Sequence, residues 1–352
     1  MKNYLVDLHR LRHNPYNGLY TFSCRLAEHL LNQPLHDEQF FYYLSVEKFG
    51  FFGNKPHYTA HKRYHKFFQA GTGKFDVWHL TTGISQYRPF NRKTKVVYTI
   101  HDVNFLAEDP NNIKRNRRTL KLMQHNADRA DHIVGISKYA LDLASRHLDF
   151  RNTPVSVIYN GYTVSEFPDF NEPVYKPKNP FLFSLSLVQP RKNFHVLPAF
   201  LAGNDYELVI AGLNHFDYAK KIIEEAKKYK VEDRVKLIGA VDEKNKYWYY
   251  KHCDAFLFPS IAEGFGFPPL EAMHFGKPVF LSRLTSLPEV GGEAAYYFDD
   301  FDPLAMRLVF EKGMNDFNNY NRVPAIQQQA AQFSWDKAAG EYLTVYRNCL
   351  QK

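Results

Sequence analysis

The chain has 352 residues, 45% of them hydrophobic and 23% charged, which excludes a disordered chain and favours two domains over a single core. No stretch reaches the roughly 18 apolar residues of a membrane-spanning helix, and the N-terminus has no apolar segment or cleavage site typical of a signal peptide. The three cysteines are far apart and outside any metal-ligand spacing, so a cytoplasmic protein is expected.

The formal net charge of +8 is concentrated in the first half of the chain. Residues 1–170 hold 23 Lys and Arg against 15 Asp and Glu, whereas residues 171–352 hold 22 of each. A basic half indicates an anionic partner, such as lipid phosphate, a phosphorylated acceptor or nucleic acid. The alternative is a solvated surface with a lysine bias.

Strand-like apolar runs alternate with amphipathic helical runs in the first half, a pattern typical of a parallel sheet covered by helices. The expected strands are 4–8, 40–45, 77–80, 96–100, 132–136 and 155–159. The expected helices are 20–31, 114–126 and 138–147. Ser137 is placed to cap the last of them.

Residues 165–180 hold four prolines and no periodicity, which predicts an interdomain linker. The alternation then resumes. Strands are expected at 181–185, 207–211, 235–238, 255–258 and 279–281, and helices at 193–201, 218–229, 244–252 and 270–275. Residues 334–349 form a final amphipathic helix opened by Ser334. We therefore expect an α/β protein with two Rossmann-like domains, 1–164 and 181–333, followed by the helical segment 334–352.

A glycine-rich loop with two carboxylates follows the predicted strand 255–258. Glu263, Gly264 and Gly266 precede Pro268-Pro269, which suit a first helical turn, and Glu271 lies in or near that turn. A helix N-terminus offers free N–H groups to phosphate, glycine allows close backbone approach, and carboxylates accept hydrogen bonds from hydroxyls. Taken singly, each glutamate has a structural explanation: Glu271 as an acidic residue placed for the helix dipole, and Glu263 as a residue on the loop surface.

The segment 263–271, EGFGFPPLE, resembles the donor-site signature of the GT-B glycosyltransferases, in particular the retaining family four (glycosyl transferases group 1). Residues 276–303 are similar to its bacterial mannosyltransferase-like branch. The resemblance implies that Glu263, with the amides of Phe265 and Gly266, holds the sugar and that Glu271 holds the ribose. Gly264 and Phe267 complete this donor loop.

Further segments resemble the same family in the same order. Arg191 and Lys192, after the first strand of the second half, match the basic pair that holds the donor diphosphate. Residues 235–241, with Gly239 and Val241, match the segment whose backbone contacts the nucleobase. The alternative for the basic pair is a solvated helix start. Ser334-Trp335 matches the start of the family's last helix, which crosses back to the first domain.

In the first half, His101 ends a predicted strand and matches the family's histidine beside the donor sugar. Alone, such a residue is more often a structural histidine. Gly18 occupies the place of the family's N-terminal glycine loop, where two adjacent glycines are common and this chain has Asn17-Gly18. Asn160-Gly161 matches the family's Asn-Gly before the linker and is expected to form a turn rather than to contact a ligand.

The resemblance implies two domains facing across a cleft, the first binding the acceptor and the second a nucleotide-sugar. It also implies transfer with retention of configuration, without a bound metal or other cofactor, in which His101, Glu263, Arg191 and Lys192 act on the reacting groups. Closure of the domains would exclude water. The basic residues Lys114, Arg115, Arg117 and Arg118, and the runs 55–74 and 88–95 with their aromatic neighbours, are expected to meet an acceptor or an anionic inner membrane surface.

The similarity to the bacterial mannosyltransferase-like branch favours mannose from GDP-mannose as the donor sugar. It favours as acceptor a hydroxyl of a glycan or lipid-linked precursor of bacterial surface polysaccharide or lipopolysaccharide. UDP- and dTDP-sugars, a nucleotide-sugar epimerase and a phosphorylase remain open, as do the linkage and the oligomeric state. A nucleic-acid-binding protein is a remote alternative, because no such motif is visible. A dehydrogenase is disfavoured because no Gly-x-Gly-x-x-Gly follows a strand.

Overall fold

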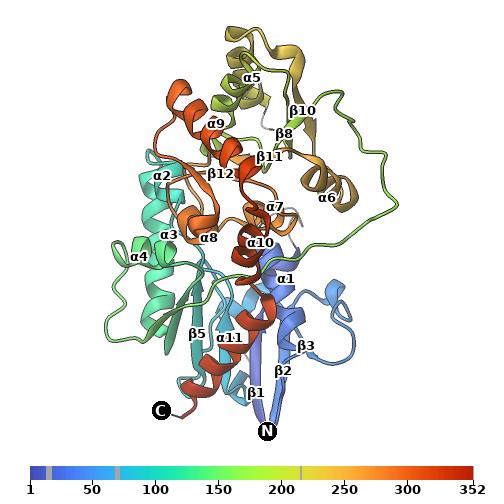
Figure 1. The fold of residues 1–352 in the computed structure, drawn as a ribbon. Coiled ribbons are helices and arrows are strands. Elements are labelled where there is room, and N and C mark those ends of the chain that lie inside the picture. The colour runs from blue at the N-terminus through green and yellow to red at the C-terminus, as the bar shows by residue number, and fades with distance from the viewer. Residues whose placement is uncertain (13–17, 68–71, 215, 352) are drawn as a thin grey trace. The chain divides into compact units, whose positions relative to one another are not determined.

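The computed structural model describes residues 1–12, 18–67, 72–214 and 216–351, and its contacts divide the chain into two compact units (Figure 1). The first unit is Met1–Gly161 together with Phe333–Lys352, and the second is Tyr162–Gln332. Each unit is a parallel sheet covered by helices, as the alternation of the sequence predicts. No helix among the described residues combines the length and hydropathy needed to cross a membrane.

Within the described residues, the sheet of the first unit has seven parallel strands in the order β3-β2-β1-β4-β5-β6-β7. Their bounds are β1 Lys2–Asp7, β2 Glu38–Leu44, β3 His57–Ala60, β4 Val77–Leu80, β5 Lys95–Ile100, β6 His132–Gly135 and β7 Val155–Val157. The chain runs outward from β1 to β3 and then from β4 to β7, so the strand order reverses between β1 and β4.

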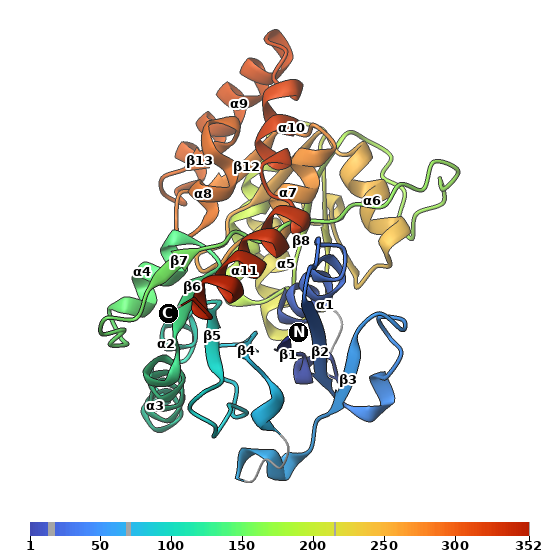
Figure 2. The same ribbon diagram turned by 90° about the horizontal axis from the view of Figure 1, so that it is seen from below.

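Helices cover both faces of this sheet because alternate strand residues point to opposite sides. The main helices are α1 Gly18–Leu30, α2 Phe105–Glu108, α3 Ile113–Arg129, α4 Lys138–Ser145 and α11 Trp335–Cys349. Leu5 packs into a core that includes Met123 of α3, whereas the ring of Tyr4 lies 5.4 Å from that of Tyr346 in α11. Figure 2 shows α1 and α11 on one face and α3 on the other. The predicted cap is confirmed, since Ser137 Oγ accepts from the Ala140 N–H.

The final helix belongs to the first unit, as expected. Its cap is Ser334, which accepts from the N–H of Asp336 at 3.2 Å. Tyr346 bonds to His79 on β4 at 2.6 Å, and Arg347 donates to Glu38 on β2 at 2.6 Å. Gly161 is required here for packing, because a Cβ atom would lie 2.1 Å from the Trp335 nitrogen.

The second unit has six parallel strands among its described residues, in the order β10-β9-β8-β11-β12-β13. The strands are β8 Phe181–Leu185, β9 Glu207–Ala211, β10 Val235–Gly239, β11 Ala255–Phe258, β12 Val279–Ser282 and β13 Tyr296–Phe298. The helices are α5 Phe216–Lys228, α6 Glu243–His252, α7 Phe267–His274, α8 Leu287–Gly291, α9 Pro303–Asn319 and α10 Val323–Ala331. Here the strand order reverses between β8 and β11.

Two expectations about this unit need correction or sharpening. The α-helix expected at 193–201 is a 3-10 helix, Phe194–Leu201, because Pro198 has no N–H to donate within it. Residues 165–180 contain no helix or strand, yet they are fixed to the second unit. The Val174 N–H donates to Asn245 at 2.7 Å and the Lys178 N–H to Glu207 at 2.7 Å.

Candidate functional site

The carboxyl ends of β8 and β11 lie side by side where the strand order of the second unit reverses. Open parallel sheets bind ligands at this position, because the loops leave the sheet in opposite directions there. Arg191 and Lys192 follow β8 in the short 3-10 turn Pro190–Lys192, and Glu263 follows β11. Residues expected to act on one ligand therefore come from the two strands that flank this switch point.

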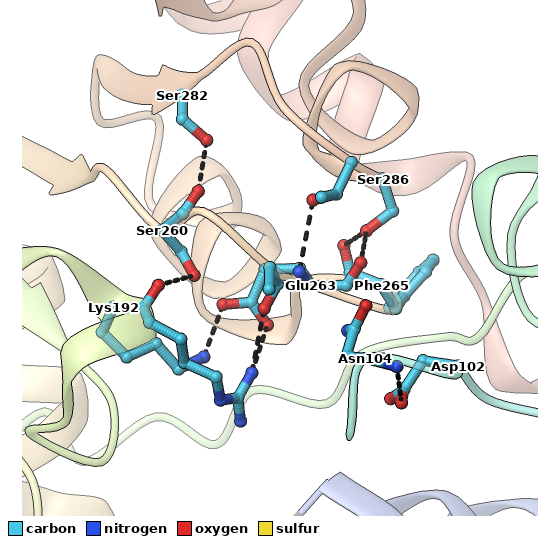
Figure 3. A network of polar contacts seen from close by, with 11 residues as sticks. Asp102, Asn104, Lys192, Ser260, Glu263, Phe265, Ser282 and Ser286 are labelled. Carbon is cyan, nitrogen blue, oxygen red and sulfur yellow. Dashed lines mark hydrogen bonds and ion pairs between the residues drawn. The ribbon is translucent and has the colours of Figure 1, made fainter. Parts of the chain in front are cut away.

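Lys192 and Glu263 form a buried ion pair (Figure 3). Lys192 Nζ donates to Glu263 Oε1 at 2.5 Å, and the two residues are 5% and 8% exposed. The Lys192 ammonium also lies 5.2 Å from the centre of the Phe258 ring. Arg191 Nη1 donates to the Ala262 carbonyl at 2.9 Å and lies 3.8 Å from Glu263 Oε2. A buried carboxylate is thus balanced by cations from the neighbouring loop.

Backbone contacts join the two loops that carry these charges. The Ile261 N–H and the Ser260 hydroxyl both donate to the Arg191 carbonyl, at 2.9 and 3.1 Å. The Ser282 hydroxyl on β12 donates in turn to the Ser260 carbonyl. The positions of Arg191 and Glu263 are therefore coupled through the main chain as well as through charge.

Two residues that the sequence did not single out, Thr285 and Ser286, also support the loop that carries Glu263. The Glu263 N–H donates to Thr285 Oγ1 at 3.2 Å, and the Ser286 hydroxyl lies 2.7 Å from the Phe265 carbonyl and 3.1 Å from that of Glu263 (Figure 3). Ser286 is fully buried, and Thr285 has a φ of 61°. A small polar pair before Leu287 and Pro288 was the available sequence signal.

The glycine loop enters α7 as the sequence predicts. Gly266 has a φ of 123°, and α7 begins at Phe267 with Pro268 and Pro269 in its second and third positions. An added Cβ at Gly266 would lie 3.0 Å from Leu287, so backbone conformation and close packing both require glycine here. Pro268 and Pro269 have no N–H, so in the first four positions of α7 the N–H groups that could face an anion are those of Phe267 and Leu270.

Glu271 lies beyond the first turn of α7, so the helix dipole does not explain it. Its Oε1 accepts from Lys246 of α6 at 2.8 Å. Burial lowers the pKa of Lys246, but the Glu271 carboxylate outweighs burial and holds that pKa above its ordinary value. Burial and then the same carboxylate raise the pKa of Tyr250. Glu271 therefore belongs to a second charged cluster, on α6 and α7.

Gly239 and Val241 lie at the end of β10, two strands from β8. Gly239 has a φ of 74° and open space where a Cβ would stand. Its carbonyl accepts from the Gly212 N–H at 2.7 Å. Val241 precedes Asp242, the N-cap of α6. This end of β10 therefore offers main-chain groups to a ligand, with little side chain in the way.

The remaining predicted residues belong to the first unit. His101 follows β5, and its Nε2 lies 2.8 Å from the Thr81 carbonyl, which can only accept. Burial lowers the pKa of His101 to about 4, so the ring is neutral at pH 7 and Nδ1 is an acceptor. The exposed Gly18 opens α1, and Asn17 lies outside the described residues.

The basic residues expected to meet an acceptor or membrane lie at the start of α3. Lys114, Arg115, Arg117 and Arg118 are all exposed, and Arg115 lies 3.7 Å from Asp109. The first turn of α3 has no acidic residue, so these cations stand at the positive end of the helix dipole. Among the described residues, no group of three or more His, Cys, Asp or Glu side chains is placed to hold a metal ion.

Comparisons with known proteins identify the family of this chain. The family described as Glycosyl transferases group 1 matches residues 166–322, and the one described as Glycosyltransferase Family 4 matches residues 25–166. The serotype-specific mannosyltransferase WbdA of Escherichia coli is 31% identical over 242 residues, which cover 64% of this chain and 29% of WbdA. This chain thus spans less than a third of that relative.

The O-antigen chain mannosyltransferase B of Escherichia coli is 25% identical over 284 residues, covering 75% of this chain and 73% of that protein. Among solved structures, Anabaena HepE in complex with UDP-glucose superposes with a TM-score of 0.70 at 14% identity, covering 98% of this chain and 100% of HepE. That likeness extends over both units and shows a shared fold. The two family matches run consecutively over most of the sequence, and the chain belongs to the group 1, family 4 glycosyltransferases of the GT-B fold.

Proposed function

We propose that this protein transfers a hexose, best matched by mannose from GDP-mannose, to a hydroxyl of a glycan or lipid-linked acceptor during synthesis of a bacterial surface polysaccharide. The observation that carries the proposal is the Lys192–Glu263 pair beside Arg191 at the switch point of the second unit. The choice of mannose rests on the relatives that are named O-antigen and serotype-specific mannosyltransferases.

Arg191, Lys192 and the N–H groups at the start of α7 are the groups we assign to the donor diphosphate. A guanidinium, an ammonium and a helix N-terminus together neutralise charge without a metal. Lys192 is already balanced by Glu263, so the arriving phosphate gives it a second anionic partner. Glu263 then has oxygen lone pairs for the sugar hydroxyls, aided by the Phe265 and Gly266 amides.

The nucleoside fits the side of the sheet toward β10. Glu271 accepts hydrogen bonds from the ribose hydroxyls, and Lys246 holds that carboxylate in place. The open main chain around Gly239 and Val241 suits the flat edge of a nucleobase. His101, as a neutral imidazole, contributes a hydrogen bond to the sugar.

In the transfer step, the bond between the sugar C1 and the diphosphate oxygen breaks while the acceptor oxygen bonds to C1 from the same face. Because the attack comes from the same face, the configuration at C1 is retained. The acceptor proton passes to the departing phosphate oxygen, so charge balances. Stabilising the negative charge that develops on the leaving group is the main catalytic contribution of Arg191 and Lys192.

A peripheral position on an anionic membrane surface suits a lipid-linked acceptor. The first unit exposes Phe49, Phe51, Tyr64 and Phe67 at 42%, 46%, 53% and 77%. Lys48 lies 5.0 Å from the centre of the Phe51 ring, and Lys66 lies 5.0 Å from that of Phe67. Exposed aromatic rings beside lysines are suited to the lipid headgroup region. Phe68, also expected there, lies outside the described residues.

A different nucleotide is the one alternative with an observation in its favour, because HepE, which shares the fold, was crystallised with UDP-glucose. The deciding experiment compares thermal stabilisation of the protein by GDP, UDP and dTDP, followed by transfer assays with the matching sugars. We expect GDP to stabilise most and mannose to be transferred. An epimerised donor in the absence of acceptor would instead identify an epimerase.

Site variants complete the test once a donor–acceptor pair transfers sugar. Glu263→Ala and Arg191→Ala are each expected to lower kcat/KM by roughly 100-fold, the size of effect seen when one group that stabilises transition-state charge is removed. Lys228→Ala, which removes an exposed lysine paired with Glu225, is the matched control and should transfer at the wild-type rate. Unchanged transfer in both site variants would refute the assignment.

A further inference from the structure

A buried aspartate–histidine pair lies at the strand-order reversal of the first unit. Asp7 ends β1 and is fully buried, and His9 follows it with 5% exposure. Asp7 Oδ1 lies 2.6 Å from His9 Nδ1, and Asp7 Oδ2 accepts from the Ser85 hydroxyl at 2.7 Å. Ser85 belongs to the loop after β4, the neighbouring strand. Both carboxylate oxygens are therefore used to orient side chains across the switch point.

The orientation of the His9 ring follows from these contacts. Burial raises the pKa of Asp7, but His9 and the hydrogen bond from Ser85 together outweigh burial and lower that pKa, so the carboxylate is charged at neutral pH and Nδ1 of His9 carries a proton. The ring also stacks on His61, with centres 5.4 Å apart and planes 17° apart, and packs edge-to-face with Tyr87, with ring centres 5.0 Å apart. The imidazole is held on three sides.

The second ring nitrogen is left for another partner. Within the described part of the chain, no hydrogen bond reaches Nε2 of His9, and this atom is not one of the fully buried polar atoms that lack a partner. A buried charged pair is costly, and well-packed apolar residues would serve stability at least as well. An imidazole fixed by a carboxylate on one nitrogen and open on the other is instead an arrangement for binding.

The position matches that of the proposed donor site in the other unit. Each sheet reverses its strand order once, and each reversal carries a buried carboxylate paired with a basic side chain: Asp7 with His9, and Glu263 with Lys192. The loop after β4 also links Asp7 to His101. Thr81 Oγ1 donates to the Asp7 carbonyl, while the Thr81 carbonyl accepts from His101.

We propose that His9, oriented by Asp7 and Ser85, binds a hydroxyl of the acceptor sugar. This inference rests on the proposed function, which assigns the donor to the second unit. Nε2 accepts from a hydroxyl when the ring is neutral and donates to one when it is protonated, so a polyol suits it in either state. The pair combines a carboxylate with an imidazole, which suits an uncharged sugar better than a phosphate.

A kinetic test distinguishes an effect on acceptor binding from an effect on donor binding. With GDP-mannose and a fluorescent mannose-terminated oligosaccharide, His9→Ala should raise the acceptor KM about 10-fold, the loss expected for one hydrogen bond. The donor KM and hydrolysis of donor without acceptor should stay at wild-type values. Asp7→Asn should shift the acceptor KM in the same direction, and His9→Gln should recover part of it. His147→Ala removes an exposed histidine that follows α4, outside the runs expected to meet the acceptor, and is the matched control.

An unchanged acceptor KM in His9→Ala would overturn the inference, as would equal losses for donor and acceptor with a lower melting temperature. A binding measurement distinguishes this failure from failure of the proposed function. The His9 Nε2 resonance of the ¹⁵N-histidine-labelled protein, assigned with His9→Gln, should shift on adding methyl α-mannopyranoside and not on adding GDP. Absence of that shift would refute the acceptor site, even if no donor supports transfer.

Discussion

At the scale of single residues, the Lys192–Glu263 pair makes the most direct prediction. Lys192→Met leaves the 8% exposed Glu263 carboxylate without its closest cation and should destabilise the second unit by about 3 kcal/mol. The double variant Lys192→Met/Glu263→Gln should recover part of this loss, because no buried charge is left unpaired. Urea unfolding of the wild type, both single variants and the double variant measures the coupling.

Lys228→Met is the control for this cycle, because its pair with Glu225 is 65% exposed on the lysine side. A surface pair of this kind contributes less than about 1 kcal/mol. If the double variant lost as much stability as the two single variants added together, Lys192 and Glu263 would not be coupled.

His101 gives a second prediction at this scale. Its pKa is lowered from 6.5 to about 4 by burial, so the unfolded chain binds a proton that the folded protein does not between these values. The stabilisation from neutral His101 is thus complete above pH 6.5 and declines as the pH falls toward 4. The wild type should lose stability relative to His101→Gln over this range, and the His101 ring signal should not titrate above pH 5.

The sequence singled out the chemical groups of the candidate site but not their mutual contacts. Glu263, Arg191 and Lys192 could be found because a glycine loop, a proline pair and a strand end occur together. Their pairing joins residues 71 positions apart and depends on β8 and β11 becoming neighbours. The role of Ser286 could not be predicted, because a small polar pair before Leu287 and Pro288 does not show that its hydroxyl supports two carbonyls.

At the scale of elements, helix α11 is held to the first sheet by polar side chains as well as by its apolar face. Arg347 donates to both oxygens of Glu38, at 2.6 and 3.0 Å. This contact lowers the pKa of Glu38 to about 2, so its stabilisation is present above the ordinary value of 4.5 and is lost as the pH falls toward 2.

Glu38→Gln should therefore destabilise the first unit by about 2 kcal/mol at pH 7, the usual contribution of a hydrogen bond to a charged group. The difference from the wild type should shrink as the pH falls below 4.5. Thermal unfolding at a series of pH values tests this. Glu28→Gln on α1, whose partner Arg25 is one turn away at the surface, is the control and should change little.

Element prediction succeeded where hydrophobic periodicity was strong and failed where tertiary contacts decide. The bounds of β8, β9 and β11 are those expected, because buried parallel strands are short continuous apolar runs. The edge strand β3 was not predicted, since its residues are at most partly buried and carry no apolar run. The segment 193–201 has helical periodicity, but Pro198 makes it a 3-10 helix.

At the scale of the whole molecule, repeated alternation and a proline-rich interval were enough to predict two α/β units. They were not enough to place that interval, because its attachment depends on side chains elsewhere in the chain. Asn245 and Glu207 accept from its backbone N–H groups, and Trp248 donates to Asn171. Pairing of this kind satisfies the polar groups of an irregular segment and leaves no signal in its own composition.

The uneven charge of the chain gives the last prediction, about membrane contact. The net charge of +8 arises from residues 1–170, and four of its cations stand exposed at the start of α3, where the helix dipole disfavours them. An anionic lipid surface would relieve this repulsion and attract each cation by about 1 kcal/mol. We expect the full chain to co-sediment with phosphatidylserine-containing vesicles and to be released as ionic strength rises, because salt screens exposed charges.

Replacing Lys114, Arg115, Arg117 and Arg118 together by Glu should weaken this binding by about 100-fold or more. The matched control replaces four exposed lysines of α5 by Glu, at Lys220, Lys221, Lys227 and Lys228, and produces the same change in net charge on the other unit. If binding depends on the local surface of α3, the control retains most of it. Equal losses in the two variants would mean that only net charge matters, and salt-independent sedimentation would exclude an electrostatic contact.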